Sequence, residues 1–328
     1  MQKIETALTE MLGIRYPIIM APMFLVSNAA MTIEALNAGI TGTIPALNYR
    51  TDKDFREALK QIRANAKGPI GINLIANKSN IKLEEQLRTC VEMHVDYIIT
   101  SLGSPEKIIN ACKPEGIKVF CDVVDDKFAR KVEDMGADAI IAVNSGAGGH
   151  AGPLPAEVLV PMLLDACSIP VISAGGVGKG DQLIPILEMG ACGVSIGSPF
   201  IATYEAPVSQ EYKQAIIDYG AKDIVMTTKI SGTPCTVINT PYVQQIGTRQ
   251  NWLEAVLSKN KSLKKYVKLL TFYKGMKAIE KAAFSATYKT VWCAGPSIEY
   301  VTEIRPVKQV VESLIKEYEV ASKREVTV

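Results

Sequence analysis

One of the two histidines in this sequence lies inside a run of glycines, AVNSGAGGHAGPLP at residues 142–155. A histidine in a packed core needs neighbours around its ring and a hydrogen-bond partner for each ring nitrogen, and glycines offer few side chains for either purpose. Glycines instead let a ligand approach the backbone closely. His150 is therefore a candidate general base or acid, because imidazole ordinarily titrates close to neutral pH. The alternative is a structural histidine with both nitrogens satisfied by neighbours.

Two further glycine-rich stretches, SAGGVGKGD at 173–181 and GVSIGSPF at 193–200, each contain or follow a short apolar, β-branched segment. A glycine loop that leads from a strand into a helix presents backbone N–H groups and the positive end of the helix to an anion. Either loop alone is equally consistent with a tight strand-to-helix turn. Together they predict a phosphate site, whether the phosphate belongs to a substrate or to a cofactor. The candidate residues are Ala174, Gly175, Gly176, Gly197 and Ser198, with Gly149 beside the histidine.

Other strand candidates end in residues that suit a flat ring. The segment MAPMF supplies Ala21, Pro22 and Met23 as an apolar floor, although methionine is more often ordinary core filler. Asn73, in GINLI, can offer an amide to the edge of a heterocycle or can simply hydrogen-bond a neighbouring loop. An apolar floor, an amide, His150 and a phosphate cradle on one rim suit a phosphorylated planar cofactor.

Eight short apolar segments must position these residues, and their starts are about 20 to 30 residues apart. Most of the intervals have the pattern of amphipathic helices, which indicates repeated strand-helix units. An open doubly wound sheet would also alternate strands and helices, but its dinucleotide-binding form expects GxGxxG after the first strand, where this chain has MAPMFLVSN. We therefore predict an α/β fold, a TIM (β/α)8 barrel with its ligands at the C-terminal ends of the strands. The segments are 16–22, 39–46, 68–75, 95–101, 116–123, 137–143, 169–176 and 192–200.

The pattern changes after the eighth segment, which predicts a division of the chain. Residues 1–220 are expected to form the barrel, and 221–294 a small, mostly helical cap that serves as substrate domain. Residues 295–328 are expected to return to the barrel wall as its last helix. The lysine-rich stretch 259–281 is interpreted as a solvated helix face, with an anionic partner as the alternative.

The composition is that of an ordinary globular chain of 328 residues, with 48% hydrophobic and 21% charged residues. A formal net charge of +2 indicates neither nucleic acid nor an anionic membrane surface as a partner. No apolar run approaches the roughly 20 residues that cross a bilayer, and the N-terminus lacks the pattern of a signal peptide. The seven cysteines form no CxxC pair and no metal-ligand spacing. We expect reduced thiols, no metal and a cytoplasmic location.

The motifs YPIIMAPM, GINL, GAGGHAG, SAGGVGKG and GVSIGSPF, in this order and at these spacings, resemble the FMN-dependent nitronate monooxygenases, formerly called 2-nitropropane dioxygenases. Related groups are the FMN-dependent enoyl-ACP reductases and an NADH:quinone reductase. The likeness covers about residues 10–205 and returns weakly in VWCAGPSIEYV near the C-terminus. It is fairly specific to the superfamily and poorly specific among its activities.

The resemblance implies FMN as cofactor and assigns the candidate residues to it. Ala21, Pro22, Met23 and Asn73 match positions that line the flavin, and both glycine loops match the backbone that holds its phosphate. His150 matches the histidine beside the ring, which handles the proton or the nitro group of the substrate. The implied reaction is the oxidation of alkyl nitronates with O2 through a flavin semiquinone.

Several positions depart from the family pattern. Met20 and Pro296 stand where many relatives have glutamine. Asp122, at the end of the fifth strand candidate, is also a candidate cofactor-binding residue, and it is an acid where relatives more often have a neutral or basic residue. These differences leave an NAD(P)H-dependent reductase of an enoyl thioester or quinone as the alternative. A flavin-free sugar-phosphate isomerase or aldolase is the alternative from another class. The oligomeric state stays open, with a homodimer as one option.

Overall fold

The computed structural model describes residues 3–77, 80–229, 234–249 and 291–325. Eight parallel strands close into a barrel in chain order, and β1 pairs with the last barrel strand to seal it. The predicted barrel is therefore confirmed, with each strand inside its predicted segment. The barrel strands are β1 (Ile18–Met20), β2 (Thr41–Pro45), β3 (Ile70–Ile75), β4 (Tyr97–Ser101), β5 (Lys118–Val123), β6 (Ala139–Val143), β8 (Val171–Ala174) and β9 (Gly193–Ile196).

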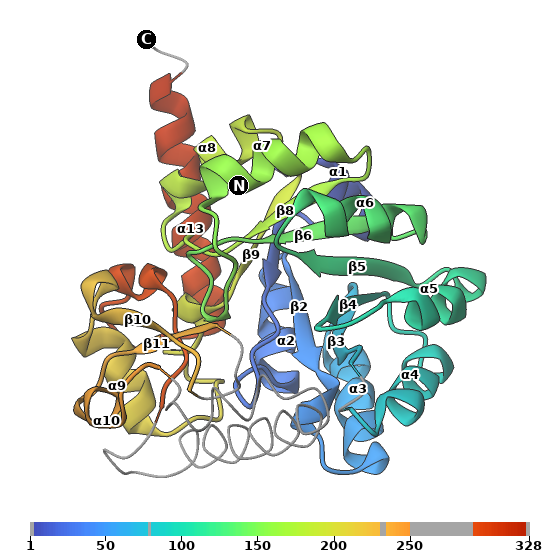
Figure 1. Ribbon diagram of the computed structural model, residues 1–328, viewed down its shortest axis with the longest axis horizontal. Helices are drawn as coiled ribbons and strands as arrows, with labels where there is room; N and C mark the ends of the chain where they lie inside the picture. Colours follow the sequence, from blue (N-terminus) through green and yellow to red (C-terminus); the bar gives the residue numbers. More distant parts are fainter. Residues whose placement is uncertain (1–2, 78–79, 230–233, 250–290, 326–328) are drawn as a thin grey trace.

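Helices surround the barrel, and the C-terminal helix α13 packs against α2 and α8 in this outer layer (Figure 1). The α-helices are α1 (Ala7–Leu12), α2 (Ala29–Asn37), α3 (Asp52–Asn65), α4 (Leu83–Glu92), α5 (Glu106–Cys112), α6 (Asp126–Asp134), α7 (Ala156–Ala166), α8 (Leu183–Glu188), α9 (Gln210–Asp218), α10 (Pro241–Ile246) and α13 (Val307–Glu325). The 3-10 helices are η1 (Ala46–Asn48), η2 (Lys113–Glu115), η3 (Gly180–Gln182), η4 (Ser198–Phe200), η5 (Ala221–Asp223) and η6 (Pro296–Tyr300). Among the described residues, none of these helices has the length and apolar character to cross a membrane.

A small antiparallel sheet stands beside the barrel, in the order β10 (Ile224–Thr227), β11 (Cys235–Ile238) and β7 (Gly149–His150). The first two strands belong to the segment for which the sequence predicts a mostly helical cap, and their β-branched residues suit paired strands better than helix. The third comes from the loop after β6, so the sheet joins this segment to the barrel. The lysine-rich stretch 259–281 lies outside the described residues.

The barrel interior is filled near the N-terminal ends of the strands. Tyr97 and Phe120 stack with ring centroids 5.1 Å apart, and the Tyr97 hydroxyl hydrogen-bonds Thr43 at 2.8 Å. A Cβ on Gly71 would lie 2.2 Å from the Tyr97 ring, so glycine is required there. Helix α1 places Leu8, fully buried, against the same cluster. Because this end is packed, the described barrel residues leave space for a ligand at the C-terminal ends of the strands.

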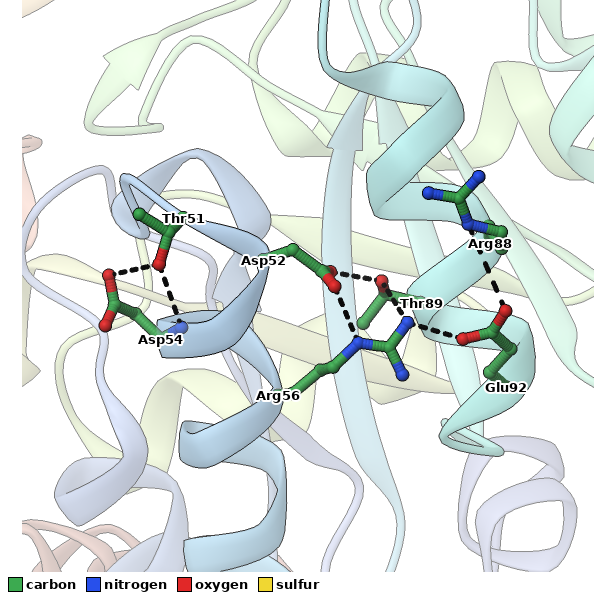
Figure 2. Close-up of polar contacts among 7 residues, drawn as sticks. All are labelled: Thr51, Asp52, Asp54, Arg56, Arg88, Thr89 and Glu92. Atoms are coloured by element: carbon green, nitrogen blue, oxygen red, sulfur yellow. Dashed lines mark hydrogen bonds and ion pairs between the residues drawn. The ribbon is translucent and has the colours of Figure 1, made fainter.

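A polar cluster joins α3 and α4 in the outer layer (Figure 2). The Arg56 guanidinium donates to Asp52 at 2.6 Å and to Thr89 at 3.1 Å, and it also contacts Glu92. The Thr89 hydroxyl in turn donates to Asp52. These contacts are partly or fully solvent-exposed and belong to the helix layer, so we interpret the cluster as a structural link between neighbouring βα units.

Candidate functional site

A cavity of about 730 Å³ lies at the C-terminal ends of the barrel strands. Its volume falls within the range of roughly 300–1,000 Å³ that is usual for small-molecule sites. All the residues predicted for the site line this one cavity, although they come from six different strand ends and loops. They are Ala21, Pro22, Met23, Asn73, Asp122, Gly149, His150, Ala174, Gly175, Gly176, Gly197 and Ser198.

The loop after β8 depends on two glycines with left-handed backbone. Gly175 has a φ of +116°, and a Cβ there would lie 2.3 Å from the Ala147 amide nitrogen. Gly176 has a φ of +86°, but a Cβ there would meet nothing within 4 Å. Asn144, which the sequence analysis did not select, braces this loop: its Nδ2 donates to the Gly175 carbonyl at 3.1 Å and its Oδ1 accepts from Gly146 at 2.8 Å. Gly175 thus provides close backbone packing, whereas Gly176 leaves open space.

Several amides of this loop are engaged within the protein. The Gly176 N–H donates to the Gly146 carbonyl at 2.9 Å, and the Gln182 side chain accepts from Gly178 and from Lys179. Gly176 therefore offers room for an anion rather than a free donor. At the neighbouring loop, Ser198 is the first residue of η4, where a helical N–H has no partner within the helix.

The Ser198 side chain has a partner of its own, because its Oγ accepts a hydrogen bond from the Gly295 amide at 2.8 Å. Gly148 passes close by, since a Cβ there would lie 2.8 Å from both groups. The segment that begins at Gly295 therefore packs against the loop of Ser198 and against the glycine run at Gly148. Ser297, from η6, also lines the cavity.

His150 is held at the cavity by backbone pairing. β7 pairs with β11, so that His150 lies opposite Cys235. The Thr236 hydroxyl donates to the Ala147 carbonyl at 2.6 Å, which fixes the start of the glycine run. The His150 side chain remains solvent-accessible, but the surrounding protein atoms disfavour the imidazolium and lower its pKa below the usual value. The imidazole is accordingly neutral, and able to accept a proton, at neutral pH.

Side chains from the three adjacent strands β3, β4 and β5 form a polar row in the lining of the cavity. The Asn73 Nδ2 on β3 donates to the Ile99 carbonyl at 3.1 Å and to Ser101 Oγ on β4 at 2.8 Å. The Ser101 hydroxyl donates to Asp122 Oδ2 on β5 at 2.5 Å. Burial raises the pKa of Asp122 to about 6. Ser101 was missed by the sequence analysis, although its place at the end of the fourth strand candidate was a usable signal.

The loop after β1 forms the apolar part of the lining. The Ser27 hydroxyl accepts from the Met23 amide and donates to the Ala21 carbonyl, both at 3.0 Å. Asn48 accepts from the amide of Leu25, a residue with a φ of +60°. These contacts fold residues 21–27 into a closed turn that presents Ala21, Pro22 and Met23 to the cavity.

Residues far along the chain complete the site, and the sequence analysis did not select them. Tyr212 on α9 stacks on Trp292 with ring centroids 5.6 Å apart and donates to the Cys293 carbonyl at 2.6 Å. Tyr212 and Cys293 both line the cavity, as does Cys235 on β11. Burial raises the pKa of all three side chains, so these groups are protonated at neutral pH.

Comparison with known proteins gives consistent results. The family model described as nitronate monooxygenase matches residues 5–317. A (3aS,4S,5R,7aS)-5-hydroxy-7a-methyl-1-oxo-octahydro-1H-indene-4-carboxyl-CoA dehydrogenase from Rhodococcus jostii is 30% identical over 246 residues, which are 75% of this chain and 69% of that protein. A probable nitronate monooxygenase from Staphylococcus aureus is 29% identical over 288 residues, covering 74% of this chain and 80% of that protein.

Solved structures share the whole architecture. FabK from Thermotoga maritima superposes with a TM-score of 0.85 at 28% identity, covering 99% of this chain and 100% of that chain. A nitroalkane oxidase from Streptomyces ansochromogenes superposes with a TM-score of 0.81 at 22% identity, covering 97% of this chain and 99% of that chain. The second similarity concerns the fold alone.

Proposed function

Since the chain belongs to the nitronate monooxygenase family, we propose that it is an FMN-dependent oxidoreductase whose substrate reacts beside His150. The observation that carries this proposal is the convergence of His150, both glycine loops and the Asn73 side chain on a single cavity. The oxidation of alkyl nitronates with O2 is the reaction we favour, because the family match and the placement of the histidine both support it.

The residues of the cavity fit FMN chemically. Gly176 leaves open space where a phosphate can approach the backbone, and Ser198 begins η4 with an N–H that has no partner within the helix. Asn73 gives both amide hydrogens to protein acceptors, which leaves its Oδ1 as an acceptor for a ring N–H. Pro22 and Met23 supply apolar surface for a planar ring.

The chemistry divides between the cofactor and the protein. FMN, when bound, supplies the acceptor for electrons from the substrate. The protein orients the substrate and handles its proton. A neutral His150 can accept the proton from the carbon next to a nitro group, or donate its N–H to the nitro oxygens of a nitronate. The largely apolar cavity strengthens such a hydrogen bond by excluding water.

A second candidate is an NAD(P)H-dependent reductase of an enoyl thioester. The name of the Rhodococcus jostii relative describes a carboxyl-CoA substrate, which supports a thioester for this cavity also. The two reactions differ in the electron donor, and that difference can be measured.

The test begins with the visible spectrum of the purified protein and proceeds to anaerobic reduction in a stopped-flow instrument. Rapid bleaching of bound flavin by propyl nitronate alone supports nitronate oxidation. Rapid bleaching by NADH or NADPH supports the reductase. A colourless protein that FMN cannot reconstitute rules out both, and a sugar-phosphate isomerase or aldolase then becomes the working hypothesis.

A further inference from the structure

The hydrogen bonds of the row formed by Asn73, Ser101 and Asp122 run from Asn73 toward Asp122. The Ile99 carbonyl can only accept, so the Asn73 side chain must turn its nitrogen toward it and toward Ser101. Ser101 Oγ then accepts from Asn73 and has one proton to give, which goes to Asp122 Oδ2. With Ser101 donating, Asp122 Oδ2 is the accepting oxygen, and a proton on the neutral acid is then carried by Oδ1.

The second oxygen of Asp122 faces the cavity. Within the described part of the chain, Oδ2 is the Asp122 side-chain oxygen that accepts a hydrogen bond, and no buried side-chain oxygen lacks a partner. Oδ1 is therefore not sealed inside the protein. Because Asp122 lines the cavity, Oδ1 is the atom that a ligand meets.

The surroundings of Asp122 favour the neutral acid. Ile99, Ile141 and Val123 line the same part of the cavity, and a ligand that fills it removes the remaining water. Among the described residues, burial is the main influence and raises the pKa of Asp122 to about 6, while the hydrogen bond from Ser101 lowers it. No described cation contributes. The other titratable groups around the cavity or next to Asp122 are Cys121, Asp125, His150, Tyr212, Cys235 and Cys293.

We propose that Asp122 enters the ligand-bound site as the neutral acid and that its Oδ1–H donates a hydrogen bond to an acceptor atom of the ligand. That acceptor is a ring oxygen or nitrogen of the flavin, or a carbonyl or nitro oxygen of the substrate. Asp122 is thus a ligand-recognition residue that favours binding at acidic pH. The proposal rests on FMN binding as proposed above.

Asp122→Asn is the informative variant, because its amide reproduces the neutral acid at every pH. The amide oxygen can accept from Ser101 while the amide nitrogen donates into the cavity. Asp122→Ala lacks the donor at every pH, and Ser101→Ala removes the group that orients Oδ2. The FMN phosphate and His150 titrate in all the variants alike. The ratio of the dissociation constants of wild type and variant therefore reports only the titration of Asp122.

The experiment measures the Kd of apo-protein for FMN by fluorescence quenching from about pH 5 to about pH 8. We expect wild type and Asp122→Asn to bind equally at the acidic end. Between about pH 6 and pH 8 the Kd of wild type divided by that of Asp122→Asn rises at least about tenfold. Asp122→Ala binds weakly throughout. An infrared difference spectrum of bound minus apo-protein shows a protonated carboxyl band that Asp122→Asn lacks.

The second arm measures binding of propyl nitronate or crotonyl-CoA to the FMN-loaded variants by spectral titration. A ratio that rises with pH for FMN places the acceptor on the flavin, and one that rises only in this arm places it on the substrate. A flat ratio in both arms overturns the inference, as does weaker binding by Asp122→Asn at alkaline pH. Wild type that binds no FMN at any pH overturns the proposed function instead, so the two failures are distinguishable.

Discussion

The cavity has two regions that are built in different ways. Along β3, β4 and β5, side chains form the lining, and the row from Asn73 to Asp122 is held by hydrogen bonds between adjacent strands. Along β6, β8 and β9, the backbone forms the lining, and Gly175 and Gly176 adopt left-handed conformations. Under the function proposed above, the first region would respond to the protonation state and polarity of a ligand, whereas the second would accommodate its phosphate.

The two regions should also respond differently to mutation. A side-chain row can lose one member and keep its fold, because the strands beneath it are paired through their backbones. In a backbone loop the same atoms determine the fold and line the cavity, so a mutation there changes both. Substitutions in each region test this difference.

Gly175→Ala should have the largest effect on stability. The new Cβ would lie 2.3 Å from the Ala147 amide nitrogen, which is a steric clash. Residue 175 also has a φ of +116°, so the clash and the backbone strain both destabilise the variant. We expect a loss of about 3 kcal/mol or more in the free energy of unfolding, measured by urea denaturation. Gly176→Ala is the matched control, because it has strain without a clash and should lose only about 1–2 kcal/mol. Equal losses for the two variants would contradict this account of the loop.

Asp122→Asn should change how the stability of the apo-protein depends on pH. The carboxyl group titrates near pH 4 in the unfolded chain and near pH 6 in the folded one. The folded wild type therefore holds an extra proton between these values, and its stability falls as the pH rises from about 4 to about 6. Across this interval, the free energy of unfolding of wild type falls by about 3 kcal/mol relative to that of the variant, and above the interval the difference stays constant. Parallel urea curves at both ends of the interval check this, and a constant difference would show that Asp122 titrates normally.

His150→Ala should keep FMN but lose at least about 10²-fold in turnover, the usual contribution of a positioned acid or base. The surrounding protein atoms lower the pKa of His150, so the wild-type kcat/KM should fall with acid pH only below about 6.5, and the variant should lack that limb. His94→Ala is the control histidine variant, since His94 does not line the cavity. Unchanged turnover in His150→Ala would show that the residue has a structural role and not a catalytic one.

Thr236→Val should have the smallest effect. It removes the hydroxyl that donates to the Ala147 carbonyl at 2.6 Å and leaves that acceptor without its partner. We expect a loss of about 1–2 kcal/mol in stability. Turnover should fall less than about tenfold, because β7 still pairs with β11. Thr236→Ser keeps the hydroxyl and should restore both values, and a failure to do so would show that the hydroxyl alone does not account for the effect.

Much of the architecture could be predicted because the barrel is built from local patterns. β-branched segments at a regular spacing predicted all eight strands. Because ligands of such barrels bind at the C-terminal ends of the strands, the candidate residues could be assigned to one rim. The small sheet was missed because its third strand, β7, has only two residues and lies in a glycine run without strand character. Ser101 and Asn144 were missed because their importance depends on partners that are 20 or more positions away in sequence.

Local residue patterns were enough to predict the barrel, the glycines where the backbone turns left-handed, and the histidine beside the cavity. These features follow from periodicity and from steric limits that act within a few residues. The folded chain was needed to show that the Gly176 N–H is already engaged, that backbone pairing holds His150, and that Asp122 lines the cavity with one oxygen bonded to Ser101. Hydrogen-bond direction and burial depend on which distant groups share a space, and that is settled only when the strands close.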